Sequence, residues 1–378
     1  MKISNRFDKP SQVYRILIIQ LGDIGDVVWS LPAVQAVRKA YPGATVSLLL
    51  RDGNGSLFAA EGSPPGIFEV RKGNGGFLGS LWAAVRLVLD LRRQRFDLVF
   101  DLRGDERGGY MAFLTGARLR AAQYFASLPA IRNRLFTHLV MQPPDYGPPA
   151  VPAETSLAIL RPFGIETETN VPELHLSADI VSRAGRILMQ EGVFPDSGAA
   201  ACDQKGHRAV PSPVSEHWVT VNLCSRWSYK EWGLGKWVQI VDWLWTEFRV
   251  AAIIIGAPAE RERAEGMVRN CAGKVYNLAG KTTLAELAGI LQLSRLHIGV
   301  DSAAPHIAAA VGTPTVTLYG PSDWRYWAPP GERHRVVVPD MACAPCHLKG
   351  CEGSGVSRCL DTLPVERVQA VIREALSV

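Results

Sequence analysis

The sequence predicts an α/β protein of two domains, each built on a parallel sheet covered by helices. Near the N-terminus, the apolar run Arg15–Gln20 leads into a glycine-rich turn and then a helical pattern. The same strand–helix alternation begins again near Val219. The proline-rich segment 142–152 lies between the two halves and indicates a rigid loop near a boundary. A chain of 378 residues is long enough for two domains of ordinary size.

The first domain is expected to span residues 1–175 and to begin with a buried strand at Arg15–Gln20. The helical pattern after the glycine turn stops at Tyr41-Pro42-Gly43, which ends helices well. The expected strands are 15–20, 45–50 and 98–101, and the expected helices are 27–40, 81–93 and 154–163.

The second domain is expected over residues 176–362, with a loop at 197–216 because that stretch is biased toward Gly, Ala, Ser, Pro and charge. The final segment 363–378 contains a helix, 365–376, that we expect to pack back across the cleft onto the first domain. Ligands bind outside the carboxyl ends of strands in such sheets, so a ligand is expected between two Rossmann-like halves. The expected strands are 219–223, 250–255, 275–278, 297–300 and 315–319, and the expected helices are 236–247, 259–271, 284–293 and 305–311.

The composition is that of an ordinary globular enzyme, with 47% hydrophobic and 20% charged residues. No apolar run reaches the roughly 18–20 residues that span a bilayer. Residues 1–14 lack the apolar core of a signal peptide, so we expect a cytoplasmic protein. In that compartment the seven cysteines are expected to be free thiols or metal ligands.

The segment Asp301–His306 has the features of a diphosphate site. A buried strand ends at Val300, and Ser302 can cap the helix that follows, with Pro305 in its first turn. Small residues at the turn leave backbone N–H groups accessible to an anion, and the helix dipole favours negative charge there. The alternative is a plain strand–helix turn with a capping serine.

The turn Gly22–Asp26 lacks the Gly-x-Gly-x-x-Gly pattern of dinucleotide sites. It places the carboxylate of Asp26 at a helix N-terminus, where it could act as a general base toward an acceptor hydroxyl. Asp23 could compete for that role, and a simple helix cap is the alternative reading.

Two further residues follow predicted strands. Lys230 is flanked by aromatic residues and could stabilise charge on a leaving diphosphate, although most lysines are simply exposed. Glu260 could accept hydrogen bonds from ribose hydroxyls, although charge pairing at a helix N-terminus would explain it equally.

Together these segments resemble the lipopolysaccharide heptosyltransferase family, also called glycosyltransferase family 9. The most specific match is Asp301–Val316 followed by Tyr319-Gly-Pro-Ser-Asp323. The others are the opening Gly-Asp-x-Gly-Asp, the Lys-x-Trp beginning at Lys230, and Asn277-Leu-Ala-Gly-Lys281. The resemblance implies a GT-B fold with two Rossmann-like domains facing a central cleft, and inverting transfer of heptose from ADP-heptose.

The resemblance also implies roles for individual residues. Asp26 matches the catalytic base, and Lys230 assists the leaving group. Glu260 matches the ribose-binding acid, and Leu278 and Gly280 flank the adenine. The remaining donor contacts it implies are Ser225, Arg226, Asp301, Ser302, Ala303 and His306. Ala303 stands where many members have glycine, and Arg226 where some have a small hydroxyl residue.

Nine arginines lie between Arg92 and Arg134, against four acidic residues. Guanidinium groups bind carboxylates and phosphates bidentately, so Arg103 and Arg107 are predicted to bind an acidic acceptor. Within the resemblance, that acceptor is the Kdo- and phosphate-bearing core of lipopolysaccharide, which would bring the enzyme to the inner face of the membrane as a peripheral protein. The alternatives are another nucleotide-sugar, a protein acceptor, or a non-catalytic nucleotide-sugar-binding protein.

Four cysteines follow one another with the spacing C-x2-C-x4-C-x7-C, at Cys343, Cys346, Cys351 and Cys359. Four thiolates can bind zinc, or less commonly iron, as a structural site, and His347 is a possible substitute ligand. The alternative is a loop of free thiols. The segment lacks the interleaved basic and aromatic residues of a nucleic-acid binder, and catalysis itself is expected to need no cofactor.

Overall fold

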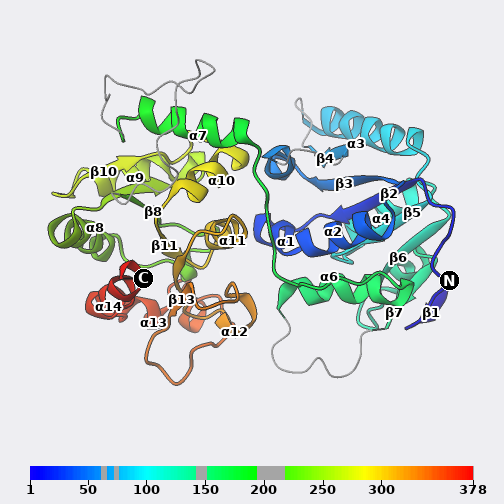
Figure 1. Ribbon diagram of the computed structural model, residues 1–378. Coiled ribbons are helices and arrows are strands. Elements are labelled where there is room, and N and C mark those ends of the chain that lie inside the picture. Colours follow the sequence, from blue (N-terminus) through cyan, green and yellow to red (C-terminus); the bar gives the residue numbers. More distant parts are fainter. Residues whose placement is uncertain (61–65, 72–75, 142–150, 194–217, 378) are drawn as a thin grey trace, which may run out of the picture. The chain divides into compact units, whose positions relative to one another are not determined.

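The computed structural model describes residues 1–60, 66–71, 76–141, 151–193 and 218–377, and the chain forms two compact units, Met1–Glu173 and Leu174–Val378. Figure 1 shows each unit as a sheet with helices on its faces. The expected loop 197–216 and most of the proline-rich segment lie outside the described residues.

The first unit contains a seven-stranded parallel sheet with the order β1-β7-β6-β5-β2-β3-β4. Strands β2 and β5 lie in the middle and are almost entirely buried, which explains their continuous apolar sequences. The strands are β1 Lys2–Ser4, β2 Arg15–Gln20, β3 Thr45–Arg51, β4 Gly66–Val70, β5 Leu98–Asp101, β6 Leu119–Gln123 and β7 His138–Val140. The helices are α1 Ile24–Trp29, α2 Leu31–Ala40, α3 Gly76–Arg93, α4 Glu106–Leu114, α5 Ala130–Arg134 and α6 Pro152–Leu160, with 3-10 turns η1 Asn54–Ala60 and η2 Arg161–Phe163.

The helix predicted at 27–40 is divided into α1 and α2 at Ser30. Pro32 occupies the first turn of α2, and proline has no backbone N–H to continue the hydrogen-bond ladder of α1. The division leaves α1 as a short helix whose first turn carries Asp26.

The second unit contains a six-stranded parallel sheet with the order β10-β9-β8-β11-β12-β13. The five expected strands are present, and the sixth, β13, is a half-polar edge strand that its sequence did not reveal. The strands are β8 Trp218–Asn222, β9 Ala251–Ile255, β10 Val275–Asn277, β11 His297–Val300, β12 Thr315–Leu318 and β13 His334–Val337. The helices are α7 Ala178–Gln190, α8 Leu234–Phe248, α9 Arg261–Val268, α10 Leu284–Leu293, α11 Ala303–Ala310, α12 Trp324–Trp327, α13 Arg358–Asp361 and α14 Val365–Leu376, with 3-10 turns η3 Ser228–Lys230, η4 Pro258–Glu260 and η5 Cys351–Gly353.

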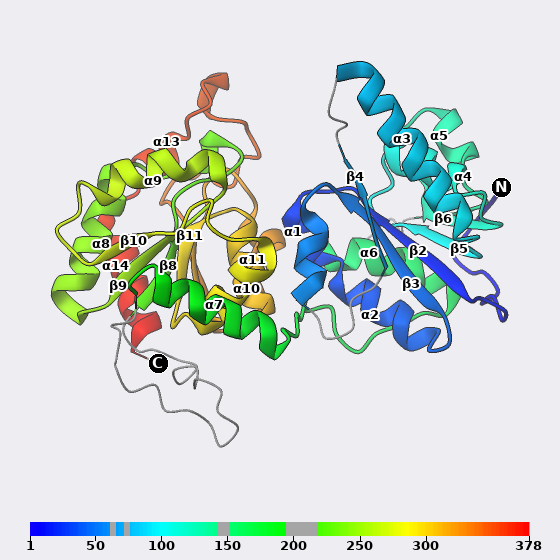
Figure 2. The same ribbon diagram turned by 90° about the horizontal axis from the view of Figure 1, so that it is seen from above.

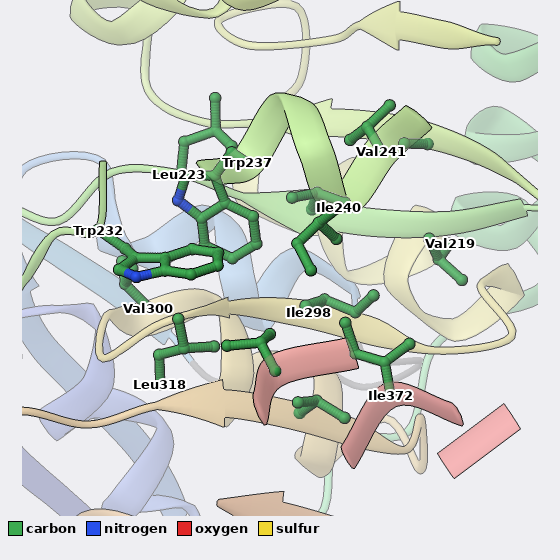
Figure 3. Packing of buried hydrophobic residues seen from close by; sticks show 14 of the residues in the cluster. Val219, Leu223, Trp232, Trp237, Ile240, Val241, Ile298, Val300, Leu318 and Ile372 are labelled. Carbon is green, nitrogen blue, oxygen red and sulfur yellow. The ribbon is translucent and has the colours of Figure 1, made fainter. Parts of the chain in front are cut away.

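Helix α14 contributes to the core of the second unit. It packs against α8, β12 and β13, and Ile372 lies among the buried strand residues in Figure 3. The same core contains Trp232 and Trp237, whose rings meet edge to face at 5.1 Å. The Nε1–H of Trp232 donates to the carbonyl of Leu363 at 3.2 Å, so the chain before α14 is fixed to the segment after Lys230. A contact of this helix with the first domain stays a prediction.

Among the described residues, no helix is both long and apolar enough to cross a membrane.

Candidate active site

The predicted donor residues follow four strands that are neighbours in the second sheet. In the order β10, β9, β8, β11, the loops after these strands carry first the predicted adenine contacts and then the predicted ribose contact. The last two loops share the predicted diphosphate and sugar contacts. Because the strands are parallel, all four loops leave the sheet at the same edge. By strand, the residues are Leu278 and Gly280 after β10, Glu260 after β9, Ser225, Arg226 and Lys230 after β8, and Asp301, Ser302, Ala303 and His306 after β11.

Lys230 and Asp301 form an ion pair, with Nζ and Oδ2 2.6 Å apart. Their side chains are 20% and 7% exposed, so the pair is largely shielded from water. Ser225 lies at the same place, because its hydroxyl donates to the carbonyl of Asp301 at 3.1 Å. Three predicted donor residues from two strands are therefore in direct contact.

Ser302 occupies the N-cap position of α11, as predicted, but its side chain does not cap the helix. Its hydroxyl donates to Oδ1 of Asn222 at 2.7 Å, which ties the turn to the end of β8. The N–H groups of the first turn of α11 therefore donate no hydrogen bond to the cap side chain, and Ala303 is the first helical residue. Asn222 is a site residue that sequence reasoning missed, although its position at the end of a predicted strand was a usable signal.

His306 lies one turn into α11 and is 5% exposed. Burial lowers the pKa of His306 to about 4, with Asp301 opposing and Lys230 reinforcing the shift. The imidazole is therefore neutral near pH 7 and can offer a hydrogen bond but no charge to a phosphate. Its ring lies 6.5 Å from that of Trp327, which follows the segment 319–323.

Glu260 bends back over its own loop. Its Oε2 accepts from the N–H of Ala257 at 2.7 Å, and a Cβ on Gly256 would lie 2.5 Å from the same oxygen. Burial raises the pKa of Glu260, against the opposing effect of the Ala257 hydrogen bond. Gly280 has a φ of +73°, and a Cβ there would lie 2.7 Å from the backbone of Pro258, so glycine at 280 allows the loops after β9 and β10 to approach closely.

Arg226 is exposed and lies over the ring of Trp227, 5.3 Å from its centroid. Lys349 approaches the same ring at 5.9 Å. The exposed tryptophan thus holds two cations next to the loop that carries Lys230.

In the first unit, Asp26 lies in the first turn of α1. Its Oδ2 accepts from the backbone N–H of Asp23 at 2.9 Å and from Nη1 of Arg103 at 2.8 Å. A Cβ on Gly22 would lie 2.4 Å from that oxygen and 2.7 Å from the guanidinium, so the glycine makes room for the pair. The Asp26 side chain is 28% exposed. Asp23, the competing candidate, is paired with Arg51.

The two predicted acceptor arginines share a carboxylate. Nη2 of Arg107 lies 2.8 Å from Oδ2 of Asp105, and Nε of Arg103 lies 3.3 Å from it. Burial alone would raise the pKa of Asp105, but the Gly108 N–H and the two guanidinium groups outweigh it and lower the pKa. Arg103 therefore bridges Asp105 and Asp26, a contact that sequence reasoning did not foresee.

Asp101 is a second residue that the sequence analysis missed. It ends β5 with no exposed surface, and its Oδ1 accepts from the N–H groups of Arg103 at 3.2 Å and Gly104 at 3.0 Å. Burial raises the pKa of Asp101 to about 7, although these hydrogen bonds and the nearby Arg132 oppose the shift. Asp101 thus fixes the backbone from which the Arg103 side chain reaches Asp26.

The predicted metal site at the cysteine segment stays a prediction. Cys343 is exposed, Cys346 and Cys351 are partly buried, and Cys359 is buried. In the described part of the chain, which includes all four, no three Cys, His, Asp or Glu side chains are grouped as a metal ion requires. The segment instead contacts the donor loop: Ser357 Oγ donates to the carbonyl of Tyr229 at 2.6 Å, and Ser228 Oγ to that of Gly355 at 3.2 Å.

Comparison with known proteins identifies the family to which the chain belongs. The family described as glycosyltransferase family 9 (heptosyltransferase) matches residues 84–356. A lipopolysaccharide heptosyltransferase 3 of Escherichia coli is 26% identical over 312 residues, covering 81% of this chain and 82% of that protein. A lipopolysaccharide heptosyltransferase 1 of Pseudomonas aeruginosa is 23% identical over 351 residues, covering 89% and 87%.

Solved structures show the same fold. A glycosyltransferase family 9 protein of Veillonella parvula superposes with a TM-score of 0.75 at 18% identity, covering 99% of both chains. The ADP-heptose LPS heptosyltransferase II of E. coli gives 0.73 at 17% identity, covering 96% and 98%. The chain therefore belongs to glycosyltransferase family 9, the heptosyltransferase family, and is a glycosyltransferase with the GT-B fold.

Proposed function

We propose that this enzyme transfers heptose from ADP-heptose to a hydroxyl of a lipopolysaccharide core acceptor, with inversion at the anomeric carbon. The observation that carries the proposal is that the loops after β10, β9, β8 and β11 follow one another along one edge of the sheet. Their residues suit adenine, then ribose, then the diphosphate and sugar, which is the order of these groups along the donor. Two relatives named lipopolysaccharide heptosyltransferases support the acceptor class. A related E. coli heptosyltransferase, solved with ADP-2-deoxy-2-fluoro heptose, supports the donor; it has a TM-score of 0.67 and 17% identity and covers 95% of this chain and 99% of that one.

On this proposal the diphosphate binds at the first turn of α11, where backbone N–H groups and the helix dipole favour an anion. Lys230 lies at the same place and stabilises the charge that builds on the leaving ADP. Asp301, which holds the ammonium of Lys230, contacts the donor sugar. Glu260 accepts hydrogen bonds from the ribose hydroxyls, and Leu278 and Gly280 border the adenine.

Transfer is a single displacement. The acceptor oxygen forms a bond to the anomeric carbon while the bond from that carbon to the phosphate oxygen breaks, and ADP leaves. Asp26 takes the proton of the acceptor hydroxyl. Its Oδ2 is engaged by the N–H of Asp23 and by Arg103, so the second carboxylate oxygen, Oδ1, is the one assigned to receive the proton.

Arg103 and Arg107 bind the acidic groups of the acceptor, such as the carboxylate of Kdo. A lipid-linked acceptor brings the enzyme to the cytoplasmic face of the membrane as a peripheral protein. No nucleic-acid partner is proposed.

A donor screen tests the function. The purified enzyme is incubated with a Kdo-terminated acceptor and with ADP-heptose, ADP-glucose, UDP-glucose or GDP-mannose, and the product is identified by mass. We expect ADP-heptose to exceed every other donor by at least tenfold in kcat/KM. A preference for a UDP- or GDP-sugar would contradict the donor assignment, and binding without turnover would favour a nucleotide-sugar-binding protein. Transfer to a protein acceptor in place of the Kdo acceptor would redirect the acceptor assignment.

The predicted zinc or iron at Cys343–Cys359 is tested separately. An iron-containing glycosyltransferase of E. coli, TibC, shares the fold, with a TM-score of 0.56 at 15% identity, and covers 97% of this chain and 77% of that one. Elemental analysis of protein purified without chelators should give about one metal per chain if the thiols close on an ion. Less than one-tenth equivalent of both metals would contradict the prediction.

A further inference from the structure

Helix α3 has an apolar face that the first unit leaves uncovered. Its inner side is anchored by Leu91, which belongs to the hydrophobic core, and by Leu87, which packs against that core. The helix lies beside β4 and α4 at the periphery of the unit (Figure 2). Five large apolar residues of the same helix are exposed: Leu78 by 67%, Leu81 by 50%, Trp82 by 74%, Val85 by 40% and Leu89 by 49%.

These five residues form one stripe. Their spacing is i, i+3, i+4, i+7 and i+11, and at 100° per residue this places them within a sector of about 100°. Leu87 and Leu91, which face the core, lie on the opposite side. The stripe is therefore a continuous apolar surface along α3. Single exposed apolar residues are common on proteins, but five at regular helical spacing indicate a binding surface.

The charges of α3 are mostly positive and lie in its second half. Arg86 is 87% exposed and Arg93 is 74% exposed, and both pair with Asp90. Arg92, also exposed, adds a third guanidinium. An amphipathic helix with an apolar stripe containing tryptophan and leucine, bordered by arginines, fits the boundary between anionic headgroups and acyl chains.

We propose that α3 is the surface by which this enzyme docks on an anionic lipid membrane, with Leu78, Trp82 and Leu89 entering the interface. The membrane would be the one that carries the lipid-linked acceptor, and this part of the proposal rests on the proposed function. In a symmetric contact between two copies, α3 would meet the same three arginines and one aspartate, so it would not find the anionic counterpart that a lipid surface offers.

The test is binding to vesicles in the absence of donor and acceptor. Full-length protein is sedimented with vesicles of phosphatidylcholine and phosphatidylglycerol at 3:1, and the triple variant L78S/W82S/L89S is compared with wild type. We expect the partition coefficient of the triple variant to fall at least tenfold. Vesicles of phosphatidylcholine alone, or addition of 0.5 M NaCl, should weaken wild-type binding by about threefold or more, because the arginine contribution is electrostatic.

The matched control is Y14S/V171S/L348S, which removes three exposed apolar side chains outside α3. It should bind vesicles like wild type, and both triple variants should keep the wild-type Tm because the replaced side chains are exposed. Equal vesicle binding by the two triple variants, or no binding by wild type, would overturn the proposal. Light scattering gives the oligomeric state of both proteins. A dimeric wild type, a monomeric L78S/W82S/L89S and unchanged vesicle binding would overturn the proposal in favour of a contact between copies.

A transfer assay with a delipidated acceptor separates this inference from the proposed function. The kcat of L78S/W82S/L89S on that acceptor should equal that of wild type. If wild type also fails to transfer, the proposed function fails while the vesicle result stands on its own.

Discussion

The two units hold their predicted site residues by different kinds of contact. In the second unit, Lys230 and Asp301 form one largely buried pair, and hydroxyl groups fix the neighbouring turns to backbone and side-chain acceptors. In the first unit, Asp26 and Arg107 are joined through Arg103 and Asp105 in a chain of ion pairs that water reaches. Exposed ion pairs contribute little to stability and exchange partners easily. On the proposed function, the donor contacts are then held as part of the sheet, and the charges expected to meet the acceptor stay accessible to a ligand.

The units also differ in how protons affect them. The second unit buries His297 and His306, and burial lowers the pKa of His297 to about 3 and that of His306 to about 4. The first unit buries Asp101, whose pKa is raised to about 7. Protonation of these two histidines therefore opposes folding of the second unit, whereas deprotonation of Asp101 opposes folding of the first.

The largest expected effect is on turnover by Asp26→Asn. The amide cannot accept the proton, so kcat should fall by about 10³-fold, within the range for general-base catalysis. Donor affinity, measured by calorimetry with ADP-heptose, should be unchanged because Asp26 belongs to the other unit.

Asp23→Asn is the control, since Asp23 is the competing carboxylate and is held by Arg51. It should keep turnover within a few-fold of wild type. A loss confined to Asp23→Asn would transfer the role of base to that residue.

The second largest effect is expected for substitution of Lys230, which separates its contribution to stability from its contribution to catalysis. Lys230→Gln leaves the mostly buried Asp301 carboxylate without its cation, so both Tm and kcat should fall, with kcat reduced by about 10²-fold. The double variant Lys230→Gln/Asp301→Asn removes both charges and should recover most of the Tm but none of the kcat. Recovery of kcat would show that Lys230 acts only through stability.

A third prediction concerns pH. The folded-state pKa of His297 and His306 lies below the unfolded value of about 6.5, so the unfolded state binds more protons as pH falls from 6.5 toward 4. Each histidine should then remove about 1.4 kcal/mol of stability per pH unit in that window. Asp101 has the opposite sign: the folded state holds its proton between pH 3.8 and about 7, so its contribution is lost as pH rises through that range.

Hydrogen exchange, followed for individual peptides and corrected for intrinsic exchange rates, measures the pH dependence of stability in each unit separately. Between pH 7 and pH 5, protection should fall in β11 and rise in β5. Asp101→Asn should abolish the rise in β5 and leave β11 unaffected. Parallel changes in both strands would contradict the contrast between the units.

The smallest effect is expected for Arg107→Gln. Arg107 touches Asp105 but not Asp26, so we expect the KM for the acceptor to rise about threefold with kcat unchanged, as for an exposed ionic contact. Arg103→Gln removes a contact to Asp26 as well and should change both KM and kcat. Steady-state kinetics with the acceptor varied distinguish the two, and identical profiles would mean that the bridge through Arg103 has no part in catalysis.

Features encoded within short segments were predictable from sequence. The strands of the second unit and the turn at Asp301–His306 follow from local patterning, because a buried strand, small residues and a capping position lie next to one another. The role of Ser302 was not predictable, since its hydroxyl binds Asn222, 80 residues away, instead of its own helix. The contact of Arg103 with Asp26 joins residues 77 apart and depends on how β2 and β5 pair.

Spacing in sequence does not determine the distances between side chains where no regular element sets the geometry. The cysteines at 343–359 have a metal-like spacing, but one is exposed and another is buried in the core, so loop conformation decides their distances. The pattern of 365–376 identified a helix correctly. Such a pattern does not specify the packing partner, because any apolar surface of matching shape can receive an amphipathic face.

The row of loops after β10, β9, β8 and β11 also has a fixed length. Neighbouring strands in a sheet lie about 4.8 Å apart, so three steps span about 14 Å, fixed by backbone hydrogen bonds that side-chain substitution hardly alters. On the proposed function, a donor held at both ends of that row must match this length, so a donor with one phosphate fewer should bind more weakly. The sheet would then discriminate donors by length before any side chain reads the sugar.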